Sequence, residues 1–214
     1  MKNRAKTLYL IPYTLWIALF VVFPILLVVY YSFIGIDGGF TLQNYAKFFT
    51  PVYLRMTLSS FWYAFIVTAL ALLIAYPTAL LLTKTKHKQL WLLLIILPTW
   101  INLLLKAYAF IGIFGTYGAA NAFLEVLGIG TQQILFTDFS FIFVATYIFI
   151  PFMLLPIYNA LEEMNQSYVD AARDLGASKW VTFRRVILPL TIDGVKSGAQ
   201  AGFIPALSLF MITR

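Results

Sequence analysis

The chain has 214 residues, of which 62% are hydrophobic and only 11% are charged. A soluble domain usually carries about a quarter charged residues, so this composition indicates a membrane protein. The 15 basic and 8 acidic residues leave a net charge of +7. The basic residues lie in short segments between apolar stretches, which argues against a nucleic-acid partner. The absence of cysteine excludes disulfides, thiolate metal sites and a cysteine nucleophile.

Five stretches are long enough to cross a bilayer as helices, which takes about 20 mostly apolar residues. They cover about 8–33, 58–82, 90–114, 139–161 and 190–212. The first apolar run is much longer than the core of a signal peptide, so we expect it to be a retained span. The fifth is less purely apolar. These stretches predict an all-α, polytopic helical bundle that forms a single membrane domain over 1–214.

The basic residues between the stretches predict the orientation. Segments 1–7, 83–89 and 162–186 hold ten Lys and Arg residues, whereas segments 34–57 and 115–138 hold two. Cytoplasmic loops carry the excess of positive charge, so we expect a cytoplasmic N-terminus. Five spans would then leave Arg214 on the outer side, directly after an apolar run. We therefore expect a further span beyond the end of this sequence.

The loop 162–189 holds the most ordered polar pattern of the chain. Ser167 and Asp170 form an S-x-x-D helix start. Apolar side chains follow at helical spacing on one face, and Gly176 stands where a helix would end in the left-handed conformation. A second start follows at Ser178. Periodicity alone leaves open an ordinary amphipathic loop or a docking element made of two short helices.

The same residues carry a family resemblance. Asp170-Ala171-Ala172, then three residues, Gly176, nine residues and Val186-Ile187-Leu188-Pro189 resemble the "EAA" loop of permeases in ATP-binding-cassette (ABC) importers. That signature reads E-A-A, x3, G, x9, I-x-L-P, and this chain departs from it at Asp170 and Val186. Asp170 has a shorter side chain than the family's glutamate, which would change the reach of any ion pair with a partner.

The resemblance implies that the loop is a coupling helix that docks on a separate ATPase subunit. The implied docking residues are Tyr168, Asp170, Ala171, Ala172, Arg173, Asp174, Leu175, Gly176 and Ala177. This chain has no G-x-x-x-x-G-K-[ST] loop, so ATP and Mg²⁺ are expected on the partner. One loop histidine, His87, and scattered acids predict no catalytic residue, no metal site and no cofactor in this chain.

The wider chain is similar to the spermidine/putrescine branch of these permeases. The supporting stretches are 97–100, 105–108, 150–153, 156–158 and 171–178. The resemblance implies the type I importer fold with six spans, a bacterial cytoplasmic membrane, a second permease subunit, two ATPase copies and an extracellular or periplasmic substrate-binding protein. A permease for ferric iron, phosphonate or another small solute is the alternative. An ion-coupled secondary transporter is disfavoured, because inverted repeats and intramembrane acids are not evident.

The substrate path is the least defined part of the sequence. Asn102 and Lys106 lie one turn apart in the third stretch, and Tyr108 follows them. Ionisable residues inside a membrane are costly and usually face a cavity or a partner, although a lysine can also extend to the interface. We take these three residues as candidates for the translocation pathway. Aromatic side chains could pass a polyamine along by weak cation–π contacts.

Overall fold

The computed structural model describes residues 2–213, and the side chains of residues 10–209. Lys2, Arg4, Lys6 and Arg214, which entered the predictions of orientation and span number, lie outside the described side chains. Within the described residues the chain is helical, with a single isolated β-bridge between Ile34 and Phe40. It divides into two compact units, Met1–Leu58 and Ser59–Arg214.

The first unit begins with α1 (Lys2–Ile17), the π-helical turn η1 (Ala18–Val22) and α2 (Phe23–Ser32). Together they contain an apolar segment, Leu10–Ser32, that is long and apolar enough to span a membrane and that lies within the predicted first span, 8–33. The π-turn has a local cause. Pro24 has no N–H to donate, and the N–H of Phe23 reaches back five residues to the carbonyl of Ala18.

A short polar corner follows α2. The amide of Asn44 donates to the carbonyls of Ser32 and Ile34, at 3.1 and 3.0 Å, and so holds α3 (Gln43–Phe48) against the end of α2. The next helix, α4 (Pro51–Thr83), starts at a proline, which suits the first helical position. It begins earlier than the predicted span 58–82, and its first turns belong to the first unit.

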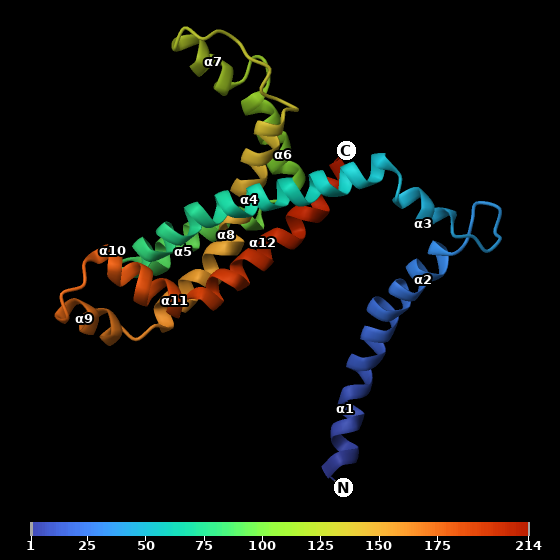
Figure 1. Ribbon diagram of the computed structural model, residues 1–214, viewed down its shortest axis with the longest axis horizontal. Coiled ribbons are helices and arrows are strands. Elements are labelled where there is room, and N and C mark those ends of the chain that lie inside the picture. Colours follow the sequence, from blue (N-terminus) through green and yellow to red (C-terminus); the bar gives the residue numbers. More distant parts are fainter. Residues whose placement is uncertain (1, 214) are drawn as a thin grey trace. The chain divides into compact units, whose positions relative to one another are not determined.

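The second unit contains the rest of α4 and the helices that follow it (Figure 1). In chain order these are α5 (Lys88–Ile96), η2 (Leu97–Trp100), α6 (Leu103–Phe114), α7 (Ala119–Val126), α8 (Asp138–Glu163), α9 (Ser167–Asp174), α10 (Lys179–Thr182), η3 (Phe183–Ile187), α11 (Leu188–Leu190) and α12 (Ile192–Thr213). Thr137 and Ser140 form a capping box at the start of α8, which fixes that end of the predicted fourth span.

The core of this unit lies where α4, α8 and α12 meet. One stripe of α4 is buried and consists mainly of small residues at helical spacing: Ser60, Ala64, Val67, Thr68, Ala71, Ala75 and Ala79. Aromatic contacts join α4 to both neighbours, with ring centroids 6.3 Å apart for Phe61 and Phe203 and 6.0 Å apart for Tyr63 and Phe141. Small residues let the helix backbones approach closely.

The closest approach is between α8 and α12, which lie side by side (Figure 1). Gly194, Gly198 and Gly202 are spaced four apart on α12 and all are buried. A Cβ atom on Gly198 would stand 2.8 Å from the carbonyl oxygen of Met153, and one on Gly194 would stand 2.8 Å from that of Pro156. Both distances are too short for a side chain, so the helix spacing requires glycine at these positions.

Two predicted spans differ from the structure. The prediction of one helix over 90–114 is wrong, because η2 and an extended Ile101 separate α5 from α6. Pro98 starts the break, and Asn102 ends it by accepting the N–H of Leu104 at 2.8 Å as a helix cap. The apolar segment that is long enough to span is instead Leu103–Val126.

The fifth predicted span corresponds to α12, but α12 is not among the four segments of the described chain that are both long and apolar enough to cross a membrane. Its glycines, Asp193, Lys196, Ser197 and Gln200 lower its hydropathy. The glycines face α8. This helix is therefore adapted to packing against protein.

We expect Gly198→Ala to lower the free energy of unfolding by about 1–3 kcal/mol, because the added methyl group meets backbone atoms of α8 that cannot rotate away. Gly112→Ala is the matched control, since a Cβ there meets nothing within 4 Å and alanine favours helix. Denaturant titration of the purified chain in detergent measures both. Equal stability of the two variants would contradict the packing described above.

Candidate functional site

The loop between α8 and α12 forms two short helices, as predicted. The first helix, α9, begins at Ser167, but Ser167 is not its cap, and that part of the prediction is wrong. The side chain of Asn165 accepts the N–H of Ser167 at 3.0 Å instead. The side chain that accepts an N–H at this helix start therefore lies two residues earlier than predicted, and the two-helix arrangement is unchanged.

The predicted apolar face of α9 points mainly to solvent. Leu175 is 89% exposed, Tyr168 is 56% exposed and Ala171 is also exposed, whereas Ala172 is half-buried. A single residue of α9, Val169, is buried, and it anchors the helix to the rest of the second unit. The charged residues Asp170 and Arg173 lie 3.9 Å apart as an exposed ion pair one turn along the helix. The face is therefore open to a partner.

Gly176 makes the bend between the two helices. Its φ angle is +81°, in the left-handed region where side chains are strained by roughly 1–2 kcal/mol. A Cβ at this position would meet nothing within 4 Å, so the requirement for glycine is conformational and not steric. Ser178 then caps α10 by accepting the N–H of Val181 at 3.3 Å, which confirms the predicted second helix start.

The second half of the loop is tied to α4. Thr191, fully buried between α11 and α12, shares a hydrogen bond of 2.8 Å with the hydroxyl of Tyr76. The ring of Tyr76 meets that of Phe183 edge-on, with centroids 5.6 Å apart, and Phe183 stacks on the exposed Trp180. Tyr76 and Thr191 therefore connect the loop to the helical bundle. The sequence pattern did not single out either residue.

An ion pair fixes the neighbouring end of α8. The amine of Lys88, at the start of α5, lies 2.5 Å from a carboxylate oxygen of Glu162. The hydrogen bond to Glu162 raises the pKa of Lys88 above its usual range. A raised lysine pKa means that the pair contributes its stability throughout neutral pH and loses it only as the solution becomes strongly alkaline. His87 precedes it on the surface, as expected.

The three candidate pathway residues have different surroundings. Asn102 is exposed and its side chain acts as the cap of α6, so a structural role accounts for it. Tyr108 is 68% exposed. Lys106 is only 9% exposed. The structure therefore separates Lys106 from the other two.

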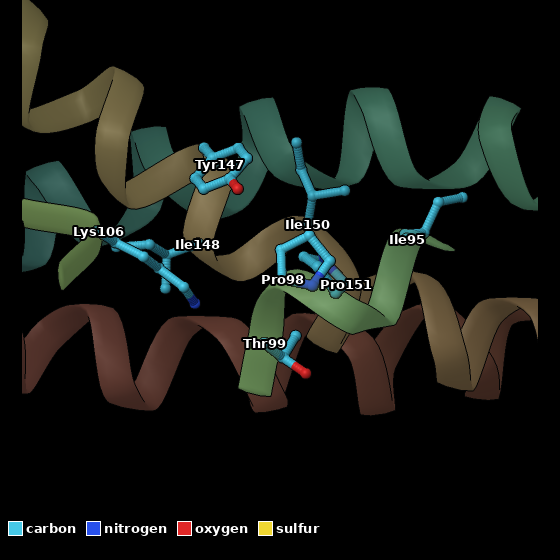
Figure 2. Close-up of a pocket in the computed structure, with 8 residues that line it drawn as sticks. All are labelled: Ile95, Pro98, Thr99, Lys106, Tyr147, Ile148, Ile150 and Pro151. Carbon is cyan, nitrogen blue, oxygen red and sulfur yellow. The ribbon is translucent and has the colours of Figure 1, made fainter. Parts of the chain in front are cut away.

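Lys106 lines a pocket of about 210 Å³ between the broken α5–α6 segment and α8 (Figure 2). The remaining lining residues are Ile95, Pro98, Thr99, Tyr147, Ile148, Ile150 and Pro151. Most of this surface is apolar, and the polar side chains besides Lys106 are Thr99 and Tyr147. In the structure Lys106 lines this pocket and is buried.

The described residues contain no group of three or more His, Asp, Glu or Cys side chains that could hold a metal ion. Two buried hydroxyls, those of Thr68 in α4 and Thr146 in α8, have no hydrogen-bond partner. Neither hydroxyl stands out in the sequence, because threonines in apolar helices often bond to their own backbone.

Comparisons with known proteins agree with this arrangement. The chain is 37% identical over its whole length to the spermidine/putrescine transport system permease protein PotB of Salmonella typhimurium (strain SL1344), of which the match covers 78%. It is 38% identical over 92% of its length to PotB of Escherichia coli (strain K12), of which 76% is covered. These are among the more similar curated relatives.

The fold resembles a solved ABC transporter. The structure of a bacterial ABC transporter involved in the import of the acidic polysaccharide alginate superimposes with a TM-score of 0.69 at 18% identity, covering 90% of this chain and 70% of that one. The fold and the loop thus define a multi-pass permease of an ABC importer. Residues 68–213 match the family model of the binding-protein-dependent transport system inner membrane component, and the chain belongs to this family.

We expect Tyr76→Phe to lower the free energy of unfolding by about 0.5–1.5 kcal/mol, because it removes the hydrogen bond to Thr191 while keeping the ring contacts. The loss stays modest because the Thr191 hydroxyl also donates to the carbonyl of Ile187. Tyr117→Phe, at a fully exposed tyrosine, serves as the control. A Tyr76 variant as stable as the control in denaturant titration would show that this hydrogen bond does not hold the loop to α4.

Proposed function

We propose that this chain is a membrane subunit of an ATP-driven importer of polyamines such as spermidine and putrescine. The observation that carries the proposal is the identity of 37% over the entire chain with a permease named for those two substrates. The match includes the spans as well as the loop, so it reaches the parts of the chain that would line a substrate path. The acidic residues of the chain lie at helix ends or in loops. This distribution is compatible with a cationic substrate that passes through the permease without being bound tightly.

The ATPase subunits would dock on α9 and the bend at Gly176. Support comes from the exposed apolar side chains of Tyr168, Ala171 and Leu175, which leave a helix face uncovered next to an exposed pair of opposite charges. A small apolar patch with a charged rim suits a specific protein contact. Asp170, Asp174 and Ala177 complete the docking region that the family signature implies, and the left-handed Gly176 sets its shape.

In this proposal the α8–α12 loop and the N-terminus face the cytoplasm. The excess of basic residues in segments 1–7, 83–89 and 162–186 supports this orientation. An external binding protein would deliver the substrate from the opposite side, and a second permease subunit would complete the pathway. ATP and Mg²⁺ would be held by the ATPase subunits, and this chain would take no catalytic part.

The function is tested with the whole importer, reconstituted in vesicles that contain ATP, with the binding protein outside. We expect uptake of labelled spermidine or putrescine that stops when internal ATP is omitted or when the ATPase subunits are left out. The chain purified alone should hydrolyse no ATP. Uptake of ferric iron or phosphonate in place of polyamines would overturn the substrate, and uptake driven by an ion gradient without ATP would overturn the mechanism.

The docking site is tested at Leu175. We expect Leu175→Asp to leave the stability of the chain unchanged, because the side chain is 89% exposed, and to weaken co-purification of the ATPase by about tenfold or more, as loss of a buried apolar contact costs roughly 1.5–3 kcal/mol. Leu175→Met, which keeps the apolar surface, is the matched control. Normal ATPase retention and normal uptake with Leu175→Asp would exclude this face as the dock.

A further inference from the structure

We infer that Lys106 serves as a gate for cationic substrates: its side chain forms part of the wall of the pocket between α6 and α8, and its positive charge keeps the permease closed to free polyamines when no substrate is passing. The inference rests on the proposed polyamine import and assigns a role to one residue within it. It starts from an energetic conflict, because a cationic side chain is held with 9% exposure in a largely apolar pocket.

The described part of the chain does not pair this charge. Lys106 makes no ion pair there, and its ordered polar neighbours in the pocket are the hydroxyls of Thr99 and Tyr147. The hydrogen of the Thr99 hydroxyl is donated to the carbonyl of Ile96 at 2.6 Å, which leaves its lone pairs to accept. In Figure 2 this hydroxyl and the Lys106 amine both point to the lower side of the view.

The backbone around the pocket suits a cation. Pro98 and Pro151 line it and have no N–H, so the carbonyls of Leu94 and Tyr147 lose the helical donor that would stand four residues further along. Interrupted transmembrane helices commonly use such carbonyls to coordinate cations. Of these two residues Tyr147 lines the pocket, so its carbonyl is the acceptor that an ammonium group here would use in place of a carboxylate.

The side chain in the pocket also resembles the proposed cargo. Lysine carries four methylenes and a primary ammonium, the same aminobutyl unit that ends putrescine and one arm of spermidine. The wall of the pocket therefore already carries the positive charge that this end of the substrate would bring. A substrate ammonium that entered the pocket would meet the charge of Lys106, and like charges repel strongly away from water. Substrate can pass only after Lys106 has moved, and in the resting state the lysine excludes it.

The test uses the complete importer in vesicles and measures putrescine entry with and without internal ATP. We expect Lys106→Met to raise entry without ATP several-fold while ATP-driven uptake is retained. Lys106→Arg keeps the charge and should stay near the wild-type rate, and Lys47→Met removes a charge from the exposed surface of α3 as a control. If Lys106 serves only packing, Lys106→Met should lower putrescine entry both with and without ATP, and that result would overturn the gate. Unchanged entry without ATP would also overturn it.

A second arm does not depend on comparing separately folded variants. The chain has no cysteine, so Lys106→Cys introduces one unique thiol in this subunit. A thiol reagent that attaches an ethylammonium group should return entry without ATP to the wild-type level, and a neutral reagent that attaches a methyl group should not. The same reagents on the unmodified importer correct for thiols in other subunits. Equal effects of the two reagents would overturn the inference.

Two failures are distinguishable. An unmodified importer that takes up no polyamine with ATP refutes the proposed function, and the gate falls with it. Normal ATP-driven polyamine uptake, together with a Lys106→Met importer that shows no increase in putrescine entry without ATP, refutes the gate alone. Failure of both Lys106→Met and Lys106→Cys to assemble, with Lys106→Arg intact, would assign the charge a structural role and also overturn the gate.

Discussion

The contact between α8 and α12 is the constraint on which the second unit depends. In a lipid environment apolar side chains gain little by leaving the solvent for another helix, so helix association relies on close packing. Gly194, Gly198 and Gly202 bring the α12 backbone up to Met153 and Pro156 with no room for a side chain. The alanine stripe of α4 completes the same core. The polar loop between α8 and α12 can be short and exposed because the helices at its two ends are fixed by this packing.

The same contact explains why α12 is less apolar than a helix surrounded by lipid. A helix that presents glycine to a neighbour has few positions left for large apolar residues, and α12 also carries the exposed pair Asp193 and Lys196. The apolar criterion that recognises α4 and α8 therefore does not recognise α12. The difference is one of surroundings, because packing against protein replaces contact with lipid.

Much of this arrangement was predictable from the sequence, for identifiable reasons. Long apolar runs predicted the apolar segments of α2, α4 and α8, and the spacing of Gly176 and Ser178 predicted the bend and the second loop helix. The break at 97–102 was not predicted, because a single proline inside an apolar run is compatible with a bent, continuous helix. The burial of Val169 and the bond between Tyr76 and Thr191 depend on tertiary contacts that local spacing does not encode. Lys106 was recognised from the sequence as unusual, and its burial beside a pocket depends on the break between α5 and α6 that the sequence did not predict.

The backbone from Ser178 to Thr213 has a mechanical consequence. After the cap at Ser178, α10, η3, α11 and α12 follow one another with a single non-helical residue, Thr191, between them. The π-turn at η3 absorbs the proline at 189 in the same way that η1 absorbs Pro24, by a hydrogen bond that spans five residues. A movement of the exposed start of α10 is therefore passed to α12 through helical turns and is not lost in a flexible linker. Thr191 is buried where the chain changes direction between α11 and α12, and its φ and ψ angles of −105° and 7° depart from those of a helix, so it is the point about which such a movement would turn.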